Sequence, residues 1–138
     1  MFEVDESRLQ AFADAVDDAR ISTRDSRRRV LRVCGEPGSG KTTLAVAYAA
    51  RTPRTQVIGP EWVVPADRRR LNPSMRKSLV IVDEPLFFGG LTAFLDTPGD
   101  LVVLLMQHAD DVPLDVMISN SLRFDLPHWS QGVPALYR

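Results

Sequence analysis

Residues 35–42 read Gly35-Glu36-Pro37-Gly38-Ser39-Gly40-Lys41-Thr42 and fit the pattern Gly-x-x-x-x-Gly-Lys-[Ser/Thr] without a mismatch. A loop of this kind curls its backbone N–H groups around a phosphate, which requires glycine where a Cβ would block the turn. A helix has to begin directly after the loop, because its N-terminus carries partial positive charge. The pattern predicts a phosphate-binding loop, or P-loop, over residues 35–42.

The residues of the loop have separate expected roles. Lys41 is expected to reach the β- and γ-phosphates of a nucleotide, and Thr42 to ligate Mg2+ through its hydroxyl. The flanks suit the motif, because 30–34 reads as a strand and 43–51 is rich in helix formers before Pro53. The predicted nucleotide-binding residues are Gly35, Glu36, Pro37, Gly38, Ser39, Gly40, Lys41, Thr42 and Thr43.

Composition indicates one compact domain. The chain has 138 residues, of which 44% are hydrophobic, so that a globular core is expected and a separate substrate domain is not. No transmembrane segment is expected, because no run of about 18 apolar residues occurs. The acidic start is unlike a secretory signal, which predicts a cytoplasmic location, or a virion-associated one if the protein is viral. Cys34 is the only cysteine and is expected to be buried.

Charge is unevenly distributed along the chain. Residues 1–78 carry a balance of +5 and residues 79–138 a balance of −6. Six arginines lie between Arg20 and Arg32, and a second basic cluster comprises Arg68, Arg69, Arg70, Arg76 and Lys77. Such clusters either neutralise nucleic-acid phosphates or are solvated surface, and both interpretations stay open at this point.

The first 29 residues are expected to form an N-terminal helix and a basic connector, ahead of a core over 30–138. Leu9, Phe12, Ala13 and Val16 recur at helical spacing over 5–20, and Asp5 or Ser7 could cap the helix start. The connector 21–29 is polar and without periodicity. After the P-loop helix, 55–58 is a short predicted strand, and 61–78 an irregular segment with one short helical turn.

Leu79-Val80-Ile81-Val82 is a continuous apolar run, typical of a parallel strand buried on both faces, and Asp83-Glu84 follows it. Carboxyl ends of parallel strands converge on one crevice, so Asp83 is expected to reach the metal held by Thr42. Glu84 is then suited to orient and deprotonate an attacking water.

Residues 85–126 contain the patterns of further helices and strands. Residues 85–96 are expected to form a helix, either continuous or broken at Gly89-Gly90, and 101–106 an apolar strand. If this strand lies between those of the P-loop and of Asp83, Gln107 at its end is the predicted γ-phosphate sensor. Residues 113–120 read either as a helix or as a strand, and 121–126 as a strand near the sheet edge. His108 is not expected to be catalytic or to ligate a metal.

From Val30 to Leu126 the chain resembles the ASCE division of P-loop ATPases, which carry a catalytic glutamate beside the Walker B aspartate, here Asp83-Glu84. The last third resembles FtsK/HerA-type DNA-pumping motors and viral genome-packaging ATPases, in which a strand ends in Gln, a helix ends near an Asn, and an Arg-containing strand follows. Gln107, Asn120 and Arg123 occupy those places. The ending Ile118-Ser119-Asn120 also resembles the motif C strand of superfamily 3 helicases, which makes Asn120 the alternative sensor.

The resemblance implies a three-layer α/β P-loop fold with a mainly parallel sheet of about five strands. It implies Mg-dependent ATP hydrolysis coupled to nucleic-acid translocation or packaging, with DNA favoured over RNA. The expected catalytic residues are Lys41, Glu84, Gln107 and Arg123, and the expected metal ligands Thr42 and Asp83. Hydrolysis usually needs an arginine, often from a neighbour; Arg123, Arg68, Arg69 and Arg70 are candidates, which predicts a homo-oligomer, possibly a ring.

Two other classes of function remain open from the sequence. One is a nucleotide or small-molecule kinase, in which 61–77 would close over the phosphates. The other is a nucleotide-dependent switch or assembly factor. No Asn-Lys-x-Asp motif for guanine is present, which favours ATP over GTP.

Overall fold

The computed structural model describes residues 4–36, 39–59, 69–76, 78–107 and 122–126. The predictions made for Pro37, Gly38, Arg68, His108 and the segment 113–120 with Asn120 lie outside these residues.

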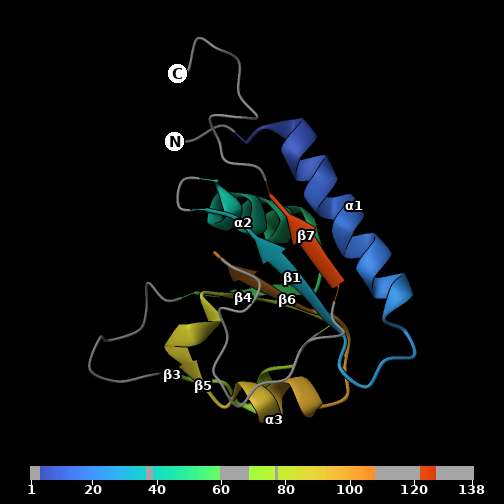
Figure 1. The fold of residues 1–138 in the computed structure, drawn as a ribbon, viewed down its shortest axis with the longest axis vertical. Coiled ribbons are helices and arrows are strands. Elements are labelled where there is room, and N and C mark those ends of the chain that lie inside the picture. Colours follow the sequence, from blue (N-terminus) through green and yellow to red (C-terminus); the bar gives the residue numbers. More distant parts are fainter. Residues whose placement is uncertain (1–3, 37–38, 60–68, 77, 108–121, 127–138) are drawn as a thin grey trace.

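A five-stranded sheet forms the centre of the molecule, and every neighbouring pair of its strands is parallel (Figure 1). Its order is β2 (Thr55–Ile58), β4 (Leu79–Asp83), β6 (Val102–Met106), β1 (Val30–Cys34) and β7 (Leu122–Asp125). The predicted α/β class is confirmed, and β7 lies at the sheet edge as predicted. β6 lies between the strand that precedes the P-loop and the strand that ends in Asp83.

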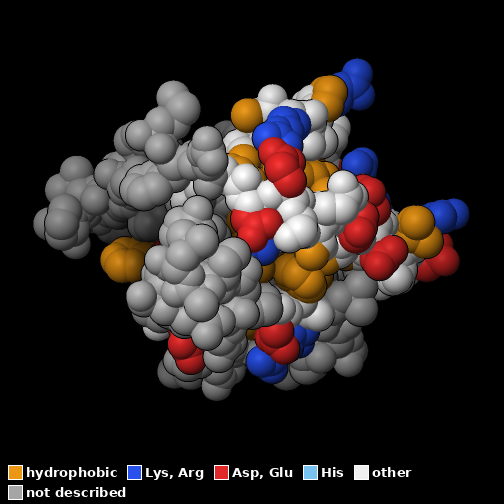
Figure 2. Space-filling view, turned by 90° about the horizontal axis from the view of Figure 1, so that it is seen from above, with side chains coloured by type: hydrophobic (Ala, Val, Ile, Leu, Met, Phe, Trp, Pro, Cys, Tyr) orange, Lys and Arg blue, Asp and Glu red, His pale blue; other side chains and the backbone are white. Residues whose placement is uncertain are grey.

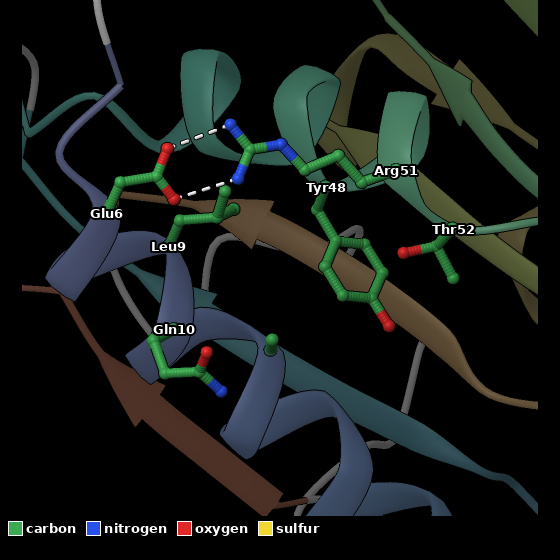
Figure 3. Close-up of a pocket in the computed structure, with 7 residues that line it drawn as sticks. Glu6, Leu9, Gln10, Tyr48, Arg51 and Thr52 are labelled. Atoms are coloured by element: carbon green, nitrogen blue, oxygen red, sulfur yellow. Dashed lines mark hydrogen bonds and ion pairs between the residues drawn. The ribbon is translucent and has the colours of Figure 1, made fainter.

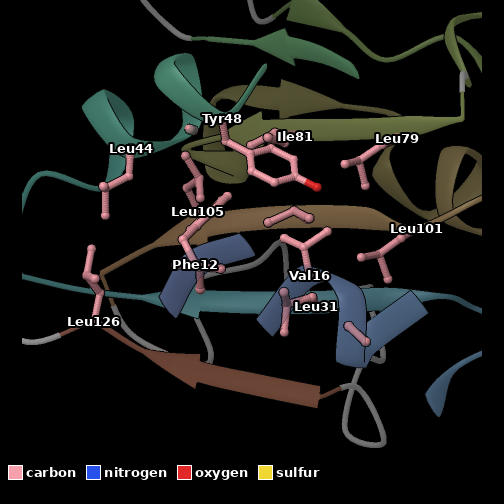
Figure 4. Packing of buried hydrophobic residues seen from close by; sticks show 14 of the residues in the cluster. Phe12, Val16, Leu31, Leu44, Tyr48, Leu79, Ile81, Leu101, Leu105 and Leu126 are labelled. Atoms are coloured by element: carbon pink, nitrogen blue, oxygen red, sulfur yellow. The ribbon is translucent and has the colours of Figure 1, made fainter. Parts of the chain in front are cut away.

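Helices cover both faces of the sheet. α1 (Glu6–Ser22) and α2 (Lys41–Arg51) share one apolar cluster with the first face, which includes Leu31, Ile81 and Leu105 (Figure 4). α3 (Leu91–Asp96) packs on the opposite face. β4 and β6 are buried on both faces, because alternate residues of a strand point to opposite sides and nearly all residues of these two strands are apolar. Cys34 is buried, as predicted, and the structure places it on the α3 side.

α1 begins where the sequence predicts, because Asp5 caps it by accepting hydrogen bonds from the backbone N–H groups of Ser7 and Arg8. Its predicted apolar face is buried, and Phe12 meets the ring of Tyr48 on α2 edge-on with 5.4 Å between ring centres. The N-terminal helix is therefore built into the same core as the sheet.

The segment 85–96 takes the broken form of its two predicted alternatives. A 3₁₀ turn, η3 (Pro85–Phe87), leads into β5 (Phe88–Gly89), and α3 begins only after Gly90. Gly90 has φ 77°, and a Cβ there would lie 2.8 Å from the carbonyl oxygen of Leu71. The backbone thus turns at Gly90 in a conformation that other residues rarely adopt. β5 pairs with β3 (Arg69–Arg70) in a separate two-stranded sheet.

Most arginines at the end of the basic connector are paired within the molecule. Arg20 and Arg29 form ion pairs with Asp100, and Arg28 donates to Asp96 at 2.7 Å. Arg27 is 3.7 Å from Asp96 but is 84% exposed. The sequence left this cluster open as either a phosphate-binding or a solvated surface, and in the structure Arg20, Arg28 and Arg29 fasten the connector to the end of α3 and to the turn after it.

Arg76, from the second basic cluster, also has a structural role. Its guanidinium donates to the carbonyl oxygens of Phe94 at 2.9 Å and Thr97 at 2.7 Å, and to that of Asp100. Carbonyls at the end of a helix lack intrahelical partners, so Arg76 closes the end of α3. The preceding η2 turn (Pro73–Met75) is the short helical turn predicted for this segment, and Asn72 caps it.

In the part of the chain that the structure describes, none of the helices has the length and apolarity needed to cross a membrane.

Replacing Phe12 with alanine is expected to lower the free energy of unfolding by about 3–5 kcal/mol, because the ring is fully buried between α1 and α2. Ile21→Ala on the same helix is the matched control, since Ile21 is 63% exposed, and it should change stability by less than about 0.5 kcal/mol. Urea unfolding measures both. Equal losses for the two variants would show that α1 is not packed as described.

The Asp96 carboxylate should stabilise the fold in a pH-dependent way. The hydrogen bond from Arg28, with the charges of Arg28 and Arg27, lowers the pKa of Asp96 below its ordinary 3.8, although burial opposes the shift. A lowered folded pKa gives stability that is present above pH 3.8 and is lost as the pH falls through the folded value. We expect Asp96→Asn to be less stable than the parent near pH 7, with the gap closing in acid.

Urea unfolding of Asp96→Asn at about pH 7 and at about pH 3 measures this gap. Asp18→Asn is the control, because it makes the same charge change at an exposed position on α1, and it should be about as stable as the parent at pH 7. A gap of the same size at both pH values would contradict the role of the carboxylate charge.

Candidate functional site

The carboxyl ends of β1, β4 and β6 are tied together at one edge of the sheet. The N–H of Gly35 donates to the carbonyl of Met106 at 2.9 Å, and the N–H of Glu84 donates to that of Leu105 at 3.0 Å. Leu105 is the register partner of both Val33 and Asp83. The first residue of the P-loop and the Asp83-Glu84 pair therefore leave the sheet at nearly the same level.

The described part of the P-loop is tightly turned. A Cβ on Gly35 would lie 2.5 Å from the hydroxyl of Ser39, so a larger residue would push the loop open. Ser39 is fully buried, and its N–H donates to the carbonyl of Glu36 at 3.0 Å. Gly40 has φ 81° and immediately precedes α2. These two glycines account for the motif, one by space and the other by backbone conformation.

Lys41 begins α2 and is only 7% exposed. Within the described residues no carboxylate forms an ion pair with its ammonium. Burying a cation away from water is costly unless an anion offsets the charge. A phosphate bound in the loop would supply that anion.

Thr42 and Asp83 meet directly, with the Thr42 Oγ1 donating to Asp83 Oδ2 at 2.7 Å. The contact follows from the alternation along β4. Leu79 and Ile81 face the α1–α2 side, so Asp83, two residues on, points to the side on which α2 begins. Asp83 is 4% exposed. The sequence prediction that these two side chains converge is matched by this geometry, and their role in holding a metal stays a prediction.

Glu84 stands out by its backbone. It has φ 56° and ψ 70°, in the left-handed region that non-glycine residues seldom occupy. Such a conformation costs of order 1–3 kcal/mol and tends to occur at functional sites. Glu84 lies at the carboxyl edge of the sheet, directly after Asp83, and its side chain is partly exposed.

Gln107 and Arg123 differ in their relation to this site. Gln107 is exposed and directly follows β6. It is two residues after Leu105 and four after Val103, which face α2, so the alternation along the strand assigns Gln107 to the same face. Arg123 is aligned with Arg32, whose neighbours Val30 and Cys34 face α3. Arg123 therefore lies on the opposite face of the sheet from the Thr42–Asp83 contact, and its Nε donates to Asp125 at 2.7 Å.

The remaining predicted loop residues are on the surface or outside the described ranges. Glu36 and Thr43 are exposed, at the start of the loop and in the first turn of α2. Arg70 is exposed next to β5. Figure 2 shows acidic and basic side chains intermixed across the described part of one face, so charges of one sign do not gather there.

The residues present suit a magnesium nucleotide. Mg2+ prefers oxygen ligands and is commonly held by one or two protein groups together with substrate phosphates. Thr42 and Asp83 provide an adjacent hydroxyl and carboxylate, and the loop before α2 provides backbone N–H groups and a helix N-terminus.

One residue at this site was missed by the sequence analysis. Arg8 on α1 is 7% exposed, and its Nη2 donates to the carbonyl oxygen of Ser39 in the P-loop. Its spacing carried a signal, because Arg8 is four residues before Phe12 and thus on the buried face of the helix.

No protein-family model matches this chain, and no curated protein is significantly similar to it.

Gly40→Ala should destabilise the protein by about 1–2 kcal/mol, because alanine is strained at φ 81°. Gly40→Asn should cost less, since asparagine adopts this conformation more readily and nothing lies within 4 Å of a Cβ there. Urea unfolding without nucleotide compares them. Equal losses would mean that the loop does not hold Gly40 in this conformation.

Proposed function

We propose that this protein is an Mg-dependent ATPase of the ASCE type, and that hydrolysis powers movement along, or packaging of, a nucleic acid. The observation that carries the ATPase part is the 2.7 Å hydrogen bond between Thr42 and Asp83 at the carboxyl edge of a parallel sheet. It joins a hydroxyl of the phosphate-loop motif to the carboxylate that ends β4, a buried strand separated from β1 by β6. The position of β6 between β1 and β4 supports the ASCE assignment.

The chain's own residues have distinct roles in this proposal. The backbone of residues 35–42 and the ammonium of Lys41 bind the phosphates, and Thr42 and Asp83 hold Mg2+. Bound Mg2+ would offset the charge that develops on the phosphoryl oxygens. Glu84 orients a water and accepts its proton, while Gln107, on the α2 side of β6, contacts the γ-phosphate. Asn120 remains the alternative contact for this phosphate.

Arg123 acts in this proposal only on a neighbouring subunit. It lies on the α3 side of an edge strand, whereas Thr42 and Asp83 meet on the α2 side. Its side chain is 50% exposed on β7, which is an edge strand of the sheet. An arginine supplied by a neighbour commonly stabilises the transferring phosphoryl group. The proposed motor is accordingly a homo-oligomer.

The nucleic-acid part rests on the resemblance to DNA-pumping motors, since arginines 20, 28, 29 and 76 have internal partners. The kinase alternative is less favoured. Its lid would comprise 61–77, but the hydrogen bonds of Arg76 attach the end of this segment to the end of α3.

Glu84→Gln tests the hydrolytic role directly. The amide cannot accept a proton but occupies the same strained backbone position, so hydrolysis of Mg-ATP should fall about 100-fold or more while ATP binding is kept. Asp18→Asn, which removes an exposed carboxylate of α1, is the control and should hydrolyse ATP normally. Phosphate release and equilibrium binding are measured on both variants, and unchanged turnover by Glu84→Gln would reject Glu84 as the base.

The same phosphate-release assay, run with and without DNA or RNA, separates the alternatives. Stimulation by nucleic acid supports the motor, and ATP binding without hydrolysis in any of these conditions supports the switch. Transfer of the γ-phosphate to an added acceptor would instead identify a kinase.

A further inference from the structure

Arg8 is a buried cation on a helix that the P-loop motif does not include. It is 7% exposed and lies on the core-facing side of α1 together with Leu9 and Phe12. Burial lowers the pKa of Arg8, and the charge of Asp5 opposes that shift. A guanidinium taken out of water in this way has to be offset by nearby acceptors or anions.

The guanidinium reaches the phosphate loop, where its Nη2 donates to the carbonyl oxygen of Ser39, 31 residues further along the chain. Ser39 is fully buried, so this carbonyl has little access to water. The peptide unit between Ser39 and Gly40 is planar and trans, and its C=O and N–H point in opposite directions. By holding the carbonyl toward α1, Arg8 turns the N–H of Gly40 to the other side of the loop.

That orientation matters for a phosphate site, because backbone N–H groups attract an anion and carbonyl oxygens repel it. Gly40 is the last residue before α2, and its left-handed conformation allows the turn. Arg8 therefore holds the loop at Ser39, two residues before α2 begins.

Arg8 is itself held in place by contacts between α1 and α2. Glu6, two residues earlier, forms two hydrogen bonds of 2.8 and 2.9 Å with Arg51 at the end of α2. Leu9 and Tyr48 line a shallow hollow beside this ion pair (Figure 3). Since α2 also carries Lys41 and Thr42, these contacts fix Arg8 relative to the residues that bind the nucleotide.

We propose that Arg8 is a positioning residue for the phosphate site, which it organises by holding the Ser39 carbonyl so that the P-loop amides face the bound nucleotide. This inference rests on the proposed function, because it requires the loop to bind a nucleoside phosphate. Through Arg8, the N-terminal helix α1 would contribute to nucleotide binding.

The test compares Arg8→Gln, Arg8→Lys and Arg24→Gln for binding of a fluorescent ADP analogue with Mg2+. Arg8→Gln should bind about tenfold more weakly, as expected for the loss of a charged hydrogen bond. Arg8→Lys keeps the charge and a donor and should restore most of the affinity. Arg24→Gln makes the same charge change at an exposed position and should bind as the parent does.

Steady-state hydrolysis distinguishes positioning from a general loss of stability. Arg8→Gln should raise KM for ATP more than it lowers kcat, and thermal unfolding without nucleotide shows whether each variant is folded. If Arg8→Gln fails to fold, Arg8→Met, which keeps the aliphatic packing without a donor, takes its place. Parent-like affinity of a folded Arg8→Gln or Arg8→Met overturns the inference alone, whereas no nucleotide binding by the parent overturns the proposed function as well.

Discussion

The insertion of β6 between β1 and β4 is the constraint on which the rest of the candidate site depends. It separates the strand before the P-loop from the strand that ends in Asp83 by two strand spacings, or about 10 Å. Leu105 aligns with Val33 on one side and with Asp83 on the other, so both flanking strands end at one level. Thr42, in the first turn of α2, meets Asp83 at this level.

The two faces of the sheet carry different parts of the molecule. One face holds α2 and the converging polar groups, with α1 packed beside them. The other holds α3, the small β3–β5 sheet and the side of β7 on which Arg123 lies. Alternation along buried strands enforces this division, because each one-residue step moves a side chain to the opposite face. Asp83 and Arg123 are thereby assigned to opposite sides of one layer.

Five arginines of the described residues join elements of the fold. Arg28 with Asp96, and Arg20 and Arg29 with Asp100, connect the chain before β1 to the turn before β6. Arg76 closes the end of α3 from the same region. Arg8 joins α1 to the P-loop in the same manner. An arginine can do this because its planar guanidinium presents several donors at the end of a long side chain.

The sequence alone determined the elements whose cause is local. The P-loop pattern located Gly35, Lys41 and Thr42, an apolar run marked the strand that ends in Asp83, and helical spacing predicted α1. Tertiary structure decided what depends on distant partners, since periodicity contains no information about which acid an arginine meets. Pairing with Asp96 and Asp100 showed that arginines of the basic connector have structural partners. Strand register assigned Arg123 to the α3 face. Arg8 and Ser39 are 31 residues apart in the sequence, and they meet only because α1 packs beside α2 in the folded protein.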